Sequence, residues 1–159
     1  MAEREVQSAW AEWVSGLGEW HLFGGLTYDQ RRARGGQTLG VRPGADSCRH
    51  HALAWLRDAP KVVGRPIEAA VVALEYQKNG WPHLHPLLRL AGGLREGDIA
   101  RLGGLWFERH GGNRLEVPRT TNDVCAYASK YLVKDLAHGD VIFWPLRGPL
   151  TLHQPGYPL

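Results

Sequence analysis

The feature that most constrains this fold is a hairpin pattern in the middle of the chain. Residues 69–76 read Ala-Ala-Val-Val-Ala-Leu-Glu-Tyr, an apolar run typical of a buried strand. Lys78-Asn79-Gly80 then predicts a turn, because Asn-Gly tolerates the positive φ that tight hairpins require. The following run, residues 81–88, is expected to return antiparallel to the first. We therefore expect a sheet built around this hairpin.

Apolar residues recur at helical spacing in four other stretches. The helices expected from them span residues 3–15, 46–56, 96–109 and about 122–136. Asp58-Ala59-Pro60 is expected to stop the second helix, and Asn122 or Asp123 to cap the fourth.

Strands are expected on both sides of the hairpin, over residues 20–28, 115–117 and 141–144. Gly24-Gly25 lies inside the first of these and suggests a bulge or a close approach by another backbone. Hairpin strands interleaved with helices indicate an α+β domain, with a central, mostly antiparallel sheet and flanking helices. This domain is expected to span residues 1–144, because the four prolines and two glycines of residues 145–159 predict an irregular tail.

Composition narrows the class of protein. Apolar residues make up 43% of 159 residues, which is enough for a globular domain with its own core. No run of about 18 apolar residues predicts a membrane span, and the first residues lack a signal-peptide pattern. Cys48 and Cys125 form no CxxC pair, so we expect free thiols and a cytoplasmic location. The net charge of +3 leans mildly toward a polyanionic partner.

His83-Leu84-His85 predicts half of a metal site, because alternate side chains of a strand share one face. Leu84 and Leu87 are expected on the other face. Glu75 lies just before the turn and could join the histidines, giving two imidazoles and a carboxylate with open coordination positions. This set fits Mn²⁺ or Mg²⁺ at a phosphoryl centre. The alternative is two half-buried polar histidines, with Glu75 facing solvent.

A second pattern places two phenols and two ammonium groups on one side of the expected fourth helix. Residues four apart are neighbours on a helix, which groups Tyr127, Lys130, Tyr131 and Lys134. A tyrosine could attack phosphorus, with lysines favouring the phenolate and neutralising charge in the transition state. The alternative is ordinary decoration of an amphipathic helix.

Taken together, the motifs resemble the HUH endonuclease superfamily, and specifically its rolling-circle replication initiators, the Rep proteins. The strand ending Phe23-Gly-Gly-Leu-Thr27-Tyr28 looks like the first motif of that family, and His83-Leu84-His85 like its metal-binding motif. Tyr127-Ala-Ser-Lys130-Tyr131-Leu-Val-Lys134 is similar to the YxxKYxxK motif of initiators with two active-site tyrosines. The resemblance covers about residues 20–136 and implies a ferredoxin-like or RRM-like fold.

The resemblance implies a metal-dependent enzyme that nicks and rejoins single-stranded DNA at a replication origin of a plasmid or phage, with or without a hairpin. Tyr127 and Tyr131 would be the nucleophile pair, assisted by Lys130 and Lys134, and either tyrosine could attack first. A 5′-phosphotyrosine intermediate would leave a 3′-hydroxyl for a host polymerase. No GxxxxGK[ST] motif occurs, so we expect no fused helicase domain, and the chain would be either a compact initiator that relies on a host helicase or an excised nuclease domain.

Residues that could contact DNA are of two kinds. Arginines in and around the loop after the first motif could bind phosphates, namely Arg31, Arg32, Arg34 and Arg42. Trp81 could stack on a base, or it could instead close the sheet edge. Other functions compatible with the pattern are a single-strand transposase or relaxase, a non-catalytic single-strand binding domain, and a metal hydrolase acting through water.

Overall fold

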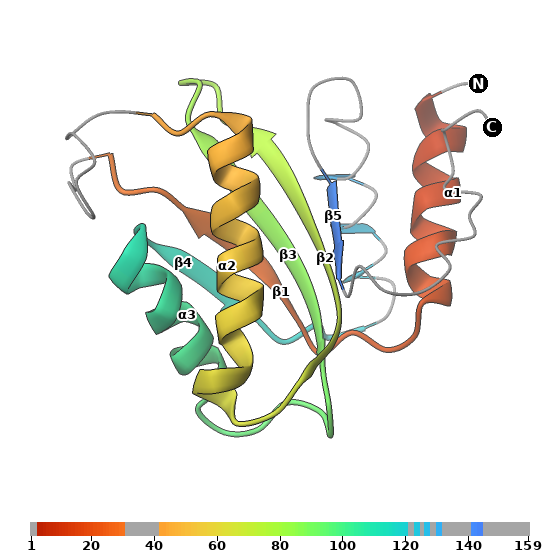
Figure 1. Cartoon of the computed structure of the whole chain (residues 1–159). Coiled ribbons are helices and arrows are strands. Elements are labelled where there is room, and N and C mark those ends of the chain that lie inside the picture. The colour runs from red at the N-terminus through yellow and green to blue at the C-terminus, as the bar shows by residue number, and fades with distance from the viewer. Residues whose placement is uncertain are drawn as a thin grey trace.

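The computed structural model describes residues 3–30, 42–120, 123–124, 126–127, 130–131 and 141–144. The elements in these ranges follow in this order: α1 (Glu3–Gly16), β1 (Leu22–Thr27), α2 (Ala45–Val63), β2 (Ile67–Tyr76), β3 (Pro82–Leu90), α3 (Asp98–Arg109), β4 (Asn113–Glu116) and β5 (Val141–Trp144) (Figure 1). The described residues among 123–131, called the tyrosine segment below, are helical. The predicted α+β class is confirmed, whereas the tail at 145–159 lies outside the described residues.

The strands form one antiparallel sheet in the order β4-β1-β3-β2-β5. Four of these strands and two helices follow the chain order β1-α2-β2-β3-α3-β4, which is the split βαβ arrangement of ferredoxin-like folds. The predicted hairpin is β2 and β3, with β3 at the centre of the sheet between β1 and β2. The strand that carries both histidines is therefore paired along both edges.

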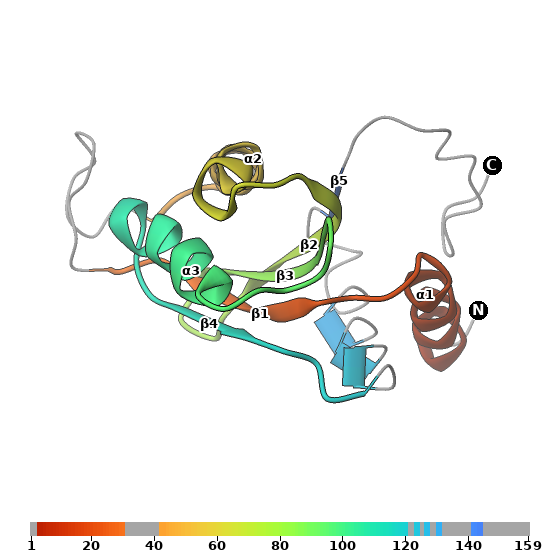
Figure 2. The ribbon, with the colours of Figure 1, turned by 90° about the horizontal axis from the view of Figure 1, so that it is seen from below.

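Each face of the sheet has its own apolar cluster. The helices α2 and α3 lie on one face, and the tyrosine segment lies on the other (Figure 2). The larger cluster, on the face covered by α2 and α3, includes Trp55 and Trp106 packed with Leu84 of β3. The smaller cluster, on the opposite face, joins Val14 of α1 and Val124 of the tyrosine segment to the sheet. The sheet thus separates a helix-covered core from a face that remains partly open.

The position of Leu87 corrects one expectation from the sequence. Leu84 packs in the cluster under α2 and α3, as predicted, but Leu87 packs in the smaller cluster on the opposite face. Strand side chains alternate with a period of two, so Leu87 follows His83 and His85 to their face. The prediction that Leu87 points away from the histidines is wrong.

The helix α2 is longer than predicted and passes through Pro60 to end at Val63. Ala59 and Val63 continue its apolar stripe and are buried, so packing holds the last turn despite the missing proline N–H. Gly64 ends the helix with a φ of 74°, and its N–H donates to the carbonyl of Pro60. Tertiary packing therefore outweighs the helix-breaking tendency of Pro60.

The turn between β2 and β3 is confirmed in position but differs in conformation. Gly80 has a φ of 81° and donates its N–H to the carbonyl of Gln77 at 2.8 Å, whereas Asn79 has a negative φ. The side chain of Asn79 instead accepts a hydrogen bond from the N–H of Trp81 at 3.0 Å. One glycine thus supplies the left-handed conformation that the turn requires.

The tyrosine segment begins at a different cap from the one predicted. The hydroxyl of Thr120 accepts a hydrogen bond from the N–H of Asp123 at 3.1 Å, the contact expected of an N-cap residue. Asp123 is already helical, and Asn122 lies outside the described residues.

None of the helices in the described ranges combines the length and apolar character that crossing a membrane requires.

Candidate active site

The open face of the sheet collects the residues of the first two predicted motifs. Glu75 of β2 pairs directly with His83 of β3, and His83 pairs on its other side with Thr27 of β1. Since His85 is two residues further along β3, its side chain shares this face. The register of the hairpin therefore brings Glu75 beside both histidines, as predicted.

Glu75, His83 and His85 form a cluster that could hold a metal ion. One potential ligand atom of each residue lies within 4.8 Å of those of the other two. The Nε2 atom of His85 is 2.9 Å from a carboxylate oxygen of Glu75, and the two imidazole centroids are 4.5 Å apart. His85 is only 6% exposed, so protein atoms rather than water surround most of it.

The chemistry of this cluster fits a divalent cation. Burial, together with the neighbouring His83, lowers the pKa of His85 to about 4, and burial also lowers the pKa of His83. Both imidazoles are therefore neutral at pH 7, the form that coordinates metals. The second nitrogen of His85, Nδ1, is 2.7 Å from the hydroxyl of Tyr127, and a hydrogen-bonding group at that nitrogen is usual for a metal-bound histidine.

Tyr127 and Tyr131 meet the histidines at this cluster, although they lie more than 40 residues away in the sequence. The hydroxyl of Tyr127 is 2.7 Å from Nδ1 of His85 and also donates to the carbonyl of Gly24. The ring of Tyr131 stacks on His85, with centroids 3.6 Å apart and planes 18° apart. Phe23 packs edge-on against Tyr127 at 4.9 Å and fixes its ring. The predicted convergence of phenols and imidazoles is confirmed.

The surroundings of Tyr127 favour its neutral phenol, and the expectation that lysines assist its ionisation stays a prediction. Burial raises the pKa of Tyr127 far above its ordinary value, and Tyr131, Glu75 and Glu116 add to the shift. Lys130 is exposed, and its Nζ lies 5.1 Å from the ring centroid of Tyr131. Tyr127 is therefore a neutral phenol here, and cationic charge brought into the cavity would favour its ionisation.

The paired glycines of β1 make room for the site, as the sequence suggested. A Cβ atom on Gly25 would lie 2.5 Å from Nε2 of His83, and one on Gly24 would collide with the backbone of Arg114. The β1–β3 pairing is interrupted at these glycines, opposite His85 and Pro86. On the other edge of β3, Pro86 pairs with Val72 in an unbroken register. The proline therefore leaves the hairpin intact and affects only the β1 side.

A cavity of about 590 Å³ joins these groups and includes residues that sequence reasoning missed. His83, His85, Tyr127 and Tyr131 line it, and Arg114 and Glu116 of β4 form its outer wall. No sequence motif marks these two residues. Their place follows from the β1–β4 register, which pairs Arg114 with Gly25 and Glu116 with Phe23.

Other predicted DNA-contact residues lie apart from this cavity or outside the described residues. Arg42 donates to the carbonyl of Gly80 at 3.0 Å, at the hairpin turn. Trp81 is half-buried beside the same turn and does not line the cavity. Three of the arginines predicted to bind phosphates, Arg31, Arg32 and Arg34, lie outside the described residues, and so does Lys134, which was predicted to assist the tyrosines.

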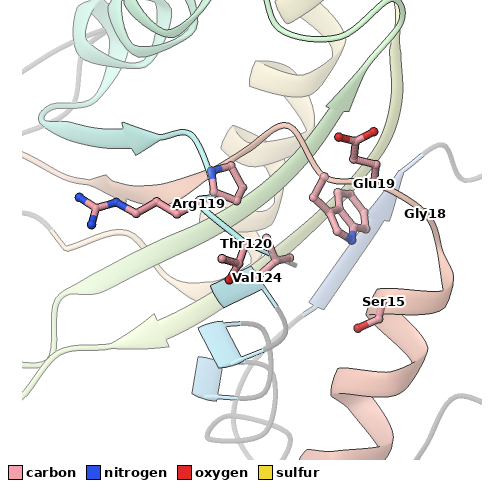
Figure 3. A pocket seen from close by; sticks show the side chains of 8 residues that line it. Ser15, Gly18, Glu19, Arg119, Thr120 and Val124 are labelled. Carbon is pink, nitrogen blue, oxygen red and sulfur yellow. The ribbon is translucent and has the colours of Figure 1, made fainter. Parts of the chain in front are cut away.

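A second cavity, of about 510 Å³, lies between the end of α1 and the residues that follow β4. Ser15, Thr120 and Val124 face it, and Glu19 and Arg119 lie at its edge (Figure 3). Its described lining contains no histidine, tyrosine or cysteine. It therefore lacks the chemistry of the first cavity.

Comparison with known proteins adds no relative: no family model, no curated protein and no solved structure matches this chain. Its function is therefore inferred from the chemistry of the site.

Proposed function

We propose that this protein is a metal-dependent endonuclease and strand transferase of the HUH type, which nicks and rejoins single-stranded DNA. The observation that carries the proposal is the 2.7 Å contact between the hydroxyl of Tyr127 and His85, at the edge of the Glu75–His83–His85 cluster. A nucleophile beside a potential metal site, in one cavity, is the arrangement that phosphoryl transfer to a tyrosine requires.

The proposed reaction is a transesterification. The oxygen of Tyr127 bonds to the phosphorus, the bond from phosphorus to the 3′ oxygen breaks, and a 5′-phosphotyrosyl ester and a free 3′-hydroxyl result. The phenol loses one proton and the 3′ oxygen gains one, so the exchange is balanced. Attack by a 3′-hydroxyl on the ester reverses the step and rejoins a strand.

Each side chain of the site has a separate role in the proposed reaction. His85 and the carbonyl of Gly24 orient the hydroxyl of Tyr127, and Phe23 restrains its ring. Glu75, His83 and His85 would hold Mn²⁺ or Mg²⁺, which would polarise a phosphate oxygen as a Lewis acid. Mixed nitrogen and oxygen ligands favour Mn²⁺ over Mg²⁺.

We propose Tyr127 as the first nucleophile and Tyr131 as the second. Tyr127 directs its hydroxyl at His85, whereas Tyr131 presents the flat face of its ring to the same imidazole. With two tyrosines, one could keep a covalent 5′ end while the other cuts again. Such a pair suits an initiator of rolling-circle replication of a plasmid or phage, which would depend on a host helicase and polymerase.

The test is a covalent adduct. Random-sequence single-stranded oligonucleotides labelled at the 3′ end are incubated with the protein and Mn²⁺, and the products are separated on a denaturing gel. The wild type is expected to give a labelled protein band, because the tyrosine retains the 3′ part of the cut strand. Tyr127→Phe should abolish the band, and Tyr131→Phe should keep a first-cut adduct.

The alternatives give different results in the same experiment. A non-catalytic single-strand binder gives neither cleavage nor adduct. A metal hydrolase acting through water cleaves without an adduct, and Tyr127→Phe leaves its cleavage unchanged. A relaxase or a single-strand transposase of the same superfamily would give an adduct too, and the DNA sequence cut would distinguish it from an initiator.

A further inference from the structure

Arg114 is the cationic side chain of β4 that lines the cavity of Tyr127 and the histidines. It pairs with Gly25 of β1, which faces His85 across the interrupted part of the β1–β3 ladder. Because Gly25 has no side chain, nothing from β1 separates Arg114 from the imidazoles on this face. Two strand spacings put the backbones of Arg114 and His85 about 10 Å apart.

Glu116 holds the guanidinium of Arg114 in place and leaves part of its hydrogen-bonding capacity for another ligand. Its Nε atom is 2.6 Å from a carboxylate oxygen of Glu116, two residues along β4 on the same face. Within the described part of the chain, its two terminal nitrogens have no acceptor, and its side chain is 85% exposed. A guanidinium held through Nε presents two parallel N–H groups, which match two oxygens of a phosphate.

We propose that Arg114 binds a backbone phosphate of the single-stranded DNA, one or two nucleotides from the bond that Tyr127 attacks. This inference rests on the proposed function and adds the path of the strand, which crosses Gly25 from the histidines toward β4. Glu116 holds the guanidinium through Nε and leaves its two terminal nitrogens for the phosphate. Arg114 contacts the substrate and so contributes to its affinity and register, while the reacting atoms remain at Tyr127.

The test uses binding and its salt dependence. The probe is a fluorescein-labelled dT20 oligonucleotide in EDTA, which prevents cleavage, and Kd is measured by anisotropy over a range of NaCl concentrations. Arg114→Gln is expected to weaken binding about 10-fold, as the loss of a charge-assisted hydrogen bond predicts. The slope of log Kd against log salt should fall by about 0.7, the value for one phosphate contact on a single strand. Arg114→Lys should keep the wild-type slope but not the full affinity, because lysine keeps the positive charge and lacks the two parallel N–H groups of the guanidinium.

The matched control is Arg57→Gln, which removes the same charge from an exposed position on α2, over the opposite face. It should leave both Kd and the slope unchanged. If Arg114→Gln behaves like Arg57→Gln while the wild type binds dT20, the Arg114 inference is wrong, whatever the adduct assay gives. If the wild type binds dT20 with the expected Arg114 effect but forms no adduct, the phosphate contact of Arg114 stands, and its place beside a bond attacked by Tyr127 fails together with the nuclease proposal. A wild type that does not bind dT20 overturns the inference.

Discussion

Replacing Gly25 with alanine offers a test of the candidate metal site in which none of the candidate ligand residues is itself mutated. The added Cβ would lie 2.5 Å from Nε2 of His83, so the imidazole must recede by about 0.9 Å to reach the 3.4 Å at which ordinary contacts begin. The atom that must move belongs to a side chain rather than to backbone, so the fold should tolerate the change. Metal binding should not, because the imidazole displaced carries one of the candidate ligand atoms.

The expected loss follows from this displacement. Disturbing the groups that orient a metal ligand typically weakens binding by about 10–100-fold, which corresponds to about 1.4–2.8 kcal/mol. Titration calorimetry with MnCl₂ measures the change in Kd for Gly25→Ala against the wild type. Circular dichroism checks that the variant is folded.

The control is Gly104→Ala, since a Cβ on Gly104 meets nothing within 4 Å. This variant should bind Mn²⁺ as the wild type does and gain about 1 kcal/mol of stability from its position inside α3. If Gly25→Ala binds Mn²⁺ with unchanged Kd while it remains folded, the assignment of His83 as a ligand is refuted.

Three further predictions concern metal, charge and backbone. MnCl₂ at 100 times its Kd should stabilise the wild type by about 2.7 kcal/mol in thermal melts, and an equal gain in His83→Ala would contradict the ligand set. Asp98→Asn should destabilise the fold by about 3 kcal/mol in urea, because Asp98 is buried against the guanidinium of Arg65, which would lose its counter-charge. Arg65 holds the pKa of Asp98 below its ordinary value, so this stabilisation is complete above the unfolded pKa near 3.9 and is lost as pH falls through the folded pKa. The difference in stability between wild type and Asp98→Asn should therefore shrink below pH 4, and a constant difference would exclude the ion pair as its source. Pro60→Ala should stabilise α2 by about 2 kcal/mol in the same urea assay. A loss of stability would show that packing of the Pro60 ring stabilises the helix by more than the proline backbone destabilises it.

The sequence alone was sufficient to locate most helices and strands and to name the three residues of the candidate metal cluster. Hydrophobic periodicity located the hairpin of β2 and β3, and the two-residue period of a strand put His83 and His85 on one face. The short turn then fixed Glu75 opposite His83. These relations are local, so neighbouring residues determine them.

Hydrophobic periodicity did not predict where two of the helices end or begin, because tertiary packing and capping decide those positions. The end of α2 could not be read correctly, because burial of Ala59 and Val63 outweighs the local effect of Pro60. The cap of the tyrosine segment was also misplaced, since Thr120 lies before the residues with the expected pattern.

Only the tertiary structure decided what surrounds the reacting groups. The burial that keeps Tyr127 neutral comes from elements far away in the sequence, and so do the stacking of Tyr131 on His85 and the opening at Gly25. Arg114 and Glu116 enter the cavity through the pairing of β4 with β1, two strands separated by more than 80 residues. Such contacts depend on strand order and register, which the sum of long-range packing sets, and no short stretch of sequence encodes them.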